Sequence, residues 1–129
     1  MWATMHWVLL GAGGAVGAIL RYAIGGWVQQ RTAGTFPWGT ITVNVAGCLF
    51  MGLLARILFG ESAVRPEYRT AILVGVLGAL TTFSTFSYET ISLLNDGQFP
   101  RAAAYVVLTN VGCLAAVWIG YRLAEQWAT

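Results

Sequence analysis

The residues of this sequence that could do chemistry are concentrated in one stretch, residues 75–89, which reads GVLGALTTFSTFSYE. The stretch begins as an apolar segment and becomes rich in hydroxyl groups within a few residues. Its two glycines and two adjacent threonines predict an interruption of regular helix near residues 78–82. Within a membrane, a broken helix is tolerated only where it is buried in protein or lines a cavity. The stretch is therefore the candidate path for an ion or a substrate.

Beyond the predicted interruption, aromatic rings and hydroxyl groups alternate around the helix. Phe83 and Phe86 are three residues apart and share a helical face. The edge of a phenyl ring is positive, so rings presented edge-on can favour an anion without a full charge. The hydroxyls of Ser84 and Thr85 can donate hydrogen bonds, and a half-helix starting near Phe83 would add its positive end. These features point to passage of a small anion, with core packing as the alternative role for the two rings.

Three further side chains within apolar segments could take part in function. Asn44 offers two N–H donors to an anion, or it forms an interhelical hydrogen bond worth about 0.6–2 kcal/mol that only holds the helices together. Glu89 could be a proton-coupling group, a vestibule residue or a hydrogen-bonded structural acid, and an acid inside a membrane is a functional candidate. Arg21 lies near the end of an apolar segment, where it could extend to the membrane interface. Cys48 and Cys113 lack metal-site spacing and are expected to be packing residues.

The composition describes the scaffold that must position these residues. The 129 residues are 57% hydrophobic and 9% charged, far from the roughly 25% charged of a soluble domain. We therefore expect an all-α membrane protein that forms a single transmembrane domain over residues 1–129. Four segments are long enough to cross the bilayer: about 5–28, 38–59, 71–94 and 102–123. The net charge of +2 gives no reason to expect nucleic acid as a partner.

Features of the spans suggest how copies of the chain assemble. Gly13 and Gly17 have a spacing that lets another helix approach closely, either within the chain or in a dimer. Four spans leave little room for an internal pore, so subunits are expected to enclose the polar stretch together. The arginines flanking the two sides number four and three, a bias too small to fix one orientation. We therefore predict insertion in both orientations and an antiparallel homodimer.

Three runs of the sequence resemble the CrcB/Fluc family of fluoride channels. They are GGAVGAILRY at 13–22, WGTITVNVAG at 38–47 and GALTTFSTFS at 78–87. The last two runs together are highly specific, and the resemblance covers essentially the whole chain. It implies a fluoride-selective channel in the bacterial plasma (inner) membrane that exports cytoplasmic fluoride passively and confers fluoride resistance.

The resemblance also implies an architecture and a set of site residues. The family forms dual-topology, antiparallel homodimers of four-helix subunits, with two fluoride pathways and a central sodium ion. Residues of this chain that match its fluoride pathway are Asn44, Phe83, Phe86, Ser84, Thr85 and Tyr105, and Thr109 retains the hydroxyl expected in the fourth span. Gly78 and Thr81 match the positions whose backbone carbonyls bind sodium. Cys113 stands where a small hydroxyl residue is expected, and a thiol donates only weakly.

Other classes of protein fit the sequence less well. A four-span, proton-coupled exporter of the small multidrug type is the alternative, but it needs a carboxylate in the first span, and this sequence has none there. The chain also lacks a phosphate-binding loop and a nucleophile–base pair, so we do not expect an enzyme.

Overall fold

The computed structural model describes residues 2–60 and 64–127, and these are almost entirely helical. Four helical segments in the described part are long and apolar enough to cross a membrane. The first is α1 (Trp2–Arg31), the second is α2 (Trp38–Leu58) and the fourth is α6 (Phe99–Trp127). The third comprises α3 (Pro66–Thr70), the π-helical η1 (Ala71–Leu77), α4 (Gly78–Leu80) and α5 (Phe83–Asn95). The chain is a multi-pass membrane protein.

The helices extend beyond the predicted spans because polar residues continue them past the apolar segments. The third span begins at Pro66 rather than near residue 71, and proline is well suited to the first position of a helix. Of the polar loop expected over residues 60–70, residues 61–63 lie outside the described part of the chain. The turn after α5 uses Gly97, whose positive φ of 71° ends the helix without a steric cost.

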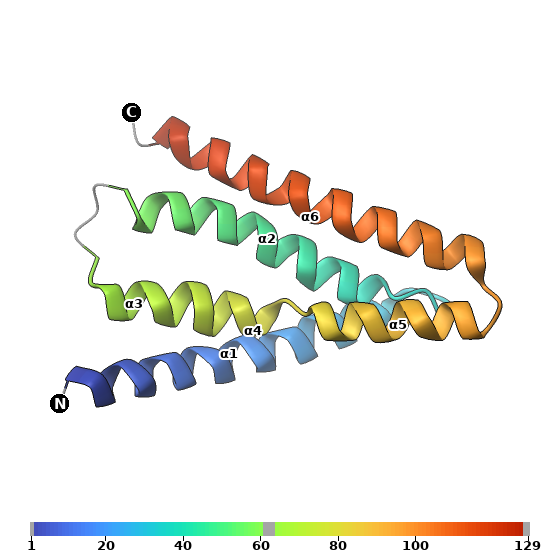
Figure 1. The fold of residues 1–129 in the computed structure, drawn as a ribbon, viewed down its shortest axis with the longest axis horizontal. Coiled ribbons are helices and arrows are strands. Elements are labelled where there is room, and N and C mark those ends of the chain that lie inside the picture. The colour runs from blue at the N-terminus through green and yellow to red at the C-terminus, as the bar shows by residue number, and fades with distance from the viewer. Residues whose placement is uncertain (1, 61–63, 128–129) are drawn as a thin grey trace.

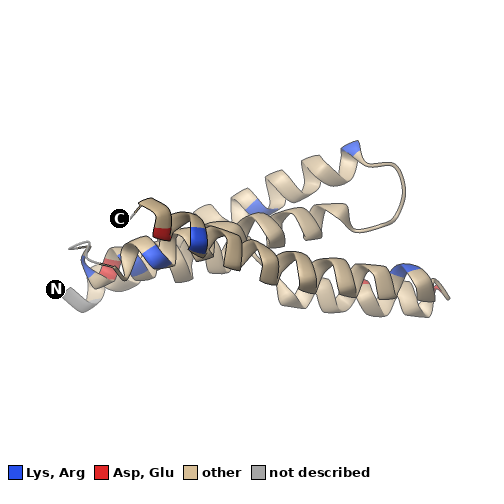
Figure 2. Cartoon of the chain, turned by 90° about the horizontal axis from the view of Figure 1, so that it is seen from above, with Lys and Arg blue, Asp and Glu red and all other residues tan. Residues whose placement is uncertain are grey.

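The bundle consists of two closely packed pairs of helices. α2 and α6 lie side by side and run in the same direction, while α1 packs against η1 and α4 (Figure 1). The start of α1, the end of α2 and the end of α6 lie at the same end of the bundle (Figure 1). Most charged residues lie toward the two ends, and long uncharged stretches of helix separate them (Figure 2). This charge distribution suits helices whose middle portions lie in hydrocarbon.

Glycines on α1 allow the third span to approach its backbone. A Cβ atom at Gly13 would lie 2.4 Å from the carbonyl oxygen of Ala71, and one at Gly17 would lie 2.1 Å from that of Val76. Both distances are far too short for a side chain, so these glycines are required for close packing. The predicted small-residue spacing thus serves contacts within the chain, which was one of its two possible roles.

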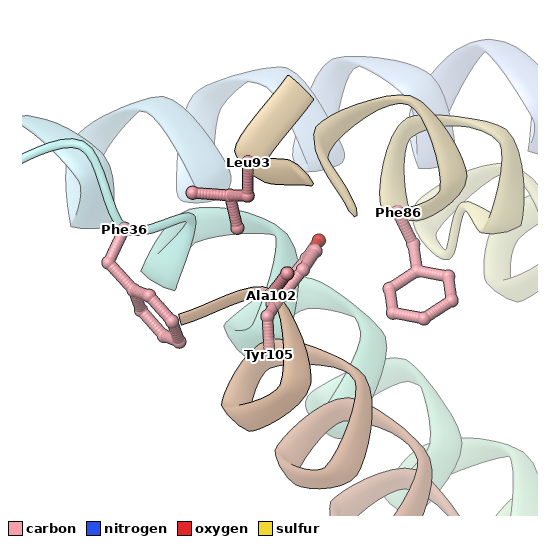
Figure 3. Packing of buried hydrophobic residues seen from close by; sticks show 5 residues of the cluster. All are labelled: Phe36, Phe86, Leu93, Ala102 and Tyr105. Atoms are coloured by element: carbon pink, nitrogen blue, oxygen red, sulfur yellow. The ribbon is translucent and has the colours of Figure 1, made fainter. Parts of the chain in front are cut away.

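The interior of the bundle is divided into two apolar clusters. One comprises Phe36, Phe86, Leu93, Ala102 and Tyr105, which join the α1–α2 connection, α5 and α6 (Figure 3). The other comprises Val43, Leu58, Leu73, Leu77 and Leu80 from α2 and the first part of the third span. In the third span, the residues of the second cluster precede the segment that joins α4 to α5, and those of the first cluster follow it.

The backbone between α4 and α5 is extended. Thr81 has φ −87° and ψ 156°, and Thr82 has φ −150° and ψ 121°. The Thr81 N–H still donates to the Leu77 carbonyl at 3.1 Å, but the backbone groups of Thr82 lie outside the helix and must find other partners. These partners define the candidate site.

Candidate ion site at the start of α5

Asn44 supplies both partners that the backbone of Thr82 needs. The Thr82 N–H donates to Oδ1 of Asn44 at 2.7 Å, and Nδ2 of Asn44 donates to the Thr82 carbonyl at 3.0 Å. Both residues are buried, with Asn44 6% exposed. Because a primary amide carries two N–H donors, one N–H of Asn44 is left for a further acceptor. The side chain therefore holds the extended segment and can still bind an anion.

The side chain of Thr82 begins α5. Its Oγ1 accepts from the backbone N–H of Thr85 at 3.1 Å, which is a helix N-cap, and lies 3.0 Å from Oγ1 of Thr85. The hydroxyl of Ser84 is also within hydrogen-bond distance, at 3.3 Å. Three hydroxyl groups therefore gather at the positive end of a 13-residue helix. This arrangement is suited to an anion.

The same hydrogen bonds leave two carbonyl groups without their helical donors. In a continuous helix, the N–H groups of Thr82 and Thr85 would donate to the carbonyls of Gly78 and Thr81, four residues earlier. Here they donate to Asn44 and to the Thr82 hydroxyl instead. The carbonyls of Gly78 and Thr81 therefore lack the donors that a continuous helix would give them.

The two phenylalanines of the first turn of α5 lie next to each other but have different surroundings. Their ring centroids are 5.3 Å apart, with the planes tilted by 47°. Phe83 is 75% exposed, whereas Phe86 is 7% exposed and lies 5.2 Å from the ring of Tyr105. Figure 3 shows Phe86 and Tyr105 within the same cluster. One ring thus faces out of the chain and the other faces the interior.

Glu89 is hydrogen-bonded by hydroxyl groups from two other helices. Thr40 of α2 donates to Oε1 at 3.0 Å, and the phenol of Tyr105 on α6 donates to Oε2 at 2.6 Å. Tyr105 is fully buried. Of the three roles left open by the sequence, the geometry agrees with a hydrogen-bonded acid, and the carboxylate also fixes α5 against α2 and α6.

The remaining candidate residues lie around this centre. Thr109 is 5% exposed, and its Oγ1 has no hydrogen-bond partner among the described residues. Arg21 and Glu89 line a cavity of about 1060 Å³ between α1, α2 and α5, which reaches Thr82 and Thr85. The cavity connects the interruption with the end of the bundle at which α5 stops.

The structure brings most of the predicted site residues together. Those from α2 and α5 meet at the interruption, Tyr105 joins through Phe86 and Glu89, and Thr109 lies one helical turn further along α6. Sequence reasoning did not select Thr82 and Thr40 as site residues. Thr82 could have been found, because a threonine placed just before a helix is a typical N-cap. The partnership of Thr40 with Glu89 has no local signal.

Comparison with known proteins identifies the family. A family model described as "CrcB-like protein, Camphor Resistance (CrcB)" matches residues 8–121. A protein of Rhizobium meliloti named "Fluoride-specific ion channel FluC" is 44% identical over 118 residues, which cover 92% of this chain and 94% of that protein. Proteins of the same name from Geobacter metallireducens and a Sulfurovum species are 43% and 46% identical, over 88% and 91% of this chain and 91% of each relative. The chain therefore belongs to the CrcB-like family.

Proposed function

We propose that this chain is a fluoride-selective ion channel that exports cytoplasmic fluoride passively and so confers fluoride resistance. The observation that carries the proposal is the buried Asn44 amide with its remaining N–H donor, next to hydroxyl groups at the positive end of α5. The relatives named as fluoride-specific ion channels supply the identity of the anion. They are channels rather than enzymes.

A passive pore is sufficient for export. Hydrogen fluoride crosses membranes as a neutral acid and ionises in the less acidic cytoplasm, where the anion is trapped. An inside-negative potential then drives the anion outward by about 2.3 kcal/mol per 100 mV. We place the chain in the bacterial plasma (inner) membrane, where such a potential exists.

The proposed fluoride pathway uses weak donors rather than fixed positive charge. The amide of Asn44 and the hydroxyls of Ser84 and Thr85 would replace water around the ion, and the hydroxyl of Thr109 would do so further along. Tyr105, whose single O–H donates to Glu89, would line the pathway with its ring. The ring edges of Phe83 and Phe86 would stabilise the anion between these groups. The unpartnered, buried Oγ1 of Thr109 supports its place in the pathway, because a buried hydroxyl otherwise loses a hydrogen bond without compensation.

We propose that two antiparallel copies of the chain form the channel. Ser84, Phe83 and Tyr88 on α5 are exposed within one chain, although α5 belongs to a membrane-spanning segment. A helix with polar residues on several sides is costly in lipid and needs protein around it. A second copy would provide that cover and bring its own interrupted third span to the same place.

The distribution of arginine supports insertion in both orientations from one gene. The side that holds the start of α1 and the end of α6 is flanked by Arg56, Arg65, Arg69 and Arg122, and the opposite side by Arg21, Arg31 and Arg101. The excess of one arginine is too small to impose one orientation. Both halves of an antiparallel dimer could therefore come from the same polypeptide.

A sodium ion at the centre of the dimer is compatible with the residues present. The carbonyls of Gly78 and Thr81 have lost their helical donors, and two copies would contribute four such oxygens. A bound sodium would supply positive charge that stabilises these dipoles in a dry interior. A high-resolution structure from sodium-containing solution that lacks density between these carbonyls would contradict this assignment.

Fluoride efflux from liposomes tests the proposed function. Liposomes that contain the purified protein and potassium fluoride would be diluted into fluoride-free buffer, and efflux would be started with a potassium ionophore and followed with a fluoride electrode. We expect rapid efflux that needs no pH gradient, and much slower efflux of chloride from matched liposomes. A proton-coupled exporter would instead need a pH gradient, and the absence of fluoride efflux would refute the proposal.

A further inference from the structure

Cys48 on α2 and Cys113 on α6 occupy matching positions on two helices that pack against each other along their length. Both are free thiols and half-buried. The two helices are parallel neighbours (Figure 1). The sequence suggested only packing roles for these residues, since neither has a metal-binding neighbour close in the chain.

The contacts on either side keep the two thiols at the same level. Two turns before them, Thr40 and Tyr105 both donate hydrogen bonds to the carboxylate of Glu89. One turn after them, Gly52 packs directly on α6, because a Cβ atom there would lie 2.1 Å from the carbonyl oxygen of Val117. All these pairs across α2 and α6 have the same sequence separation as the cysteine pair. The helices are therefore held in register, which keeps the two cysteines at the same level of the bundle.

The thiol pair also continues the line of polar groups proposed for fluoride. Cys48 follows Asn44 by four residues on α2, and Cys113 follows Thr109 by four residues on α6. Residues four apart on a helix lie on the same face. The buried, unpartnered hydroxyl of Thr109 is thus one turn from the thiol pair. A ligand between the thiols would lie on the face of both helices that carries the proposed ion path.

The ligand set selects the class of metal. Structural zinc needs four ligands, and the described residues contain no group of three or more His, Cys, Asp or Glu that could hold a metal. Two thiols alone suit soft ions that accept two sulfur ligands in a line, such as mercuric, silver or cuprous ions. With two thiolates, the divalent mercuric ion gives a complex of no net charge, and this lowers the cost of placing it in a membrane interior.

We propose that Cys48 and Cys113 form a two-thiolate binding site for a soft, two-coordinate metal ion, with mercuric ion as the best-matched member. On binding, each thiol releases its proton to water, and two sulfur–mercury bonds form without any change in oxidation state. The bridged ion would fix α2 to α6 one turn beyond Asn44 and Thr109. It would therefore stop fluoride flux, a consequence that rests on the proposed function.

Binding can be tested without reference to transport. The purified, prereduced protein would be titrated with mercuric chloride in the presence of glutathione as a competitor, and the thiolate-to-mercury absorbance would be followed in the ultraviolet. Intact-protein mass spectrometry would count the metal. We expect one mercury per chain, with loss of two protons and of both thiols accessible to alkylation.

The variants Cys48→Ser and Cys113→Ser are the matched controls. A second thiolate held on the same molecule acts at a high effective concentration, so each single variant should compete with glutathione about 10²–10⁴-fold less well than the native chain. If either single variant binds mercury as tightly as the native chain, the thiols do not converge on one ion and the proposal is wrong.

Fluoride efflux then separates this proposal from the proposed function. In liposomes, micromolar mercuric ion should block efflux by the native chain, and a dithiol added afterwards should restore the flux. Each serine variant should keep, in the presence of the metal, whatever efflux rate it has without it. Mercury bound by both thiols with efflux unchanged would refute the placement of the thiol pair on the ion path. Absence of fluoride efflux before any metal is added would instead count against the proposed function, and the binding result would stand.

Discussion

Replacing Asn44 with aspartate would keep the shape of the side chain but replace its N–H donor with a second acceptor oxygen. In the native chain, Oδ1 accepts from the Thr82 N–H at 2.7 Å, and Nδ2 donates to the Thr82 carbonyl at 3.0 Å. An ionised aspartate can still accept from the N–H, but its second oxygen would face the Thr82 carbonyl as one acceptor facing another. The donor proposed to bind fluoride would be replaced by a negative charge.

The substitution should lower both the stability of the chain and the rate of fluoride conduction. Leaving the buried Thr82 carbonyl without a donor costs about 1–3 kcal/mol of stability. A carboxylate about 4 Å from a passing anion, at an effective dielectric constant of about 20, repels it by about 4 kcal/mol. Since 1.36 kcal/mol corresponds to a tenfold change in rate, the repulsion alone should slow fluoride flux by about a thousandfold.

The assay is the initial rate of fluoride efflux from liposomes, with size-exclusion chromatography to confirm that the variant assembles as the native protein does. Asn95→Asp is the matched control, because Asn95 is an exposed asparagine at the last position of α5, away from the interior of the span. We expect Asn44→Asp to be inactive and Asn95→Asp to conduct. Efflux by Asn44→Asp within tenfold of the native rate would refute the reasoning and leave Asn44 as a residue that only holds the bundle.

Three further predictions concern the rings, the N-cap and the orientation. Phe83→Ile and Phe86→Ile roughly preserve bulk but remove the positive ring edge, so each should fold and lower fluoride efflux by about tenfold or more; normal flux in both would mean that the rings are packing residues. Thr82→Val should cost about 1 kcal/mol through loss of the N-cap and lower the thermal unfolding temperature in detergent, whereas Thr109→Val, which loses an unpaired hydroxyl, should not. Reporters active only in the cytoplasm or only outside, fused to the C-terminus, should both give signal, and three lysines appended there should shift the ratio toward the cytoplasm; signal on one side alone would exclude the antiparallel dimer.

The sequence was sufficient to predict the transmembrane segments but not the hydrogen bonds between them. The apolar spans stand out because a membrane helix must be apolar over about 20 residues, a requirement of composition alone. The partner of Asn44 is 38 residues away along the chain, and Thr40 is 49 residues from Glu89. Nothing local in the sequence encodes such pairs, because the packing of α2 against the third span decides them.

The local sequence also did not predict where the helix of the third span begins. The residues from Pro66 to Thr70 are mostly polar and suggested a loop, yet they form the helix α3. An apolar composition marks only the part of a helix that lies within the membrane. The helix itself can continue into water, where its polar residues still form backbone hydrogen bonds. The polar Glu67 and Arg69 therefore lie on a helix that is continuous with the apolar η1, and the predicted span recorded only its apolar part.

Phe83 and Phe86 differ in exposure, which their spacing in the sequence does not predict. A spacing of three residues predicts that both rings lie on one face, and the centroid distance of 5.3 Å agrees with that prediction. The spacing does not determine which ring the bundle covers, and in the structure only Phe86 is covered, by Tyr105. A ring that is 75% exposed next to exposed Ser84 has little reason to be on a lipid-facing surface, because the neighbouring hydroxyl would be costly there. If a second copy covers Phe83 as Tyr105 covers Phe86, each pathway would have one ring held within a chain and one held between chains. Phe83→Ile would then weaken dimer assembly as well as conduction, while Phe86→Ile would affect conduction and the stability of the single chain.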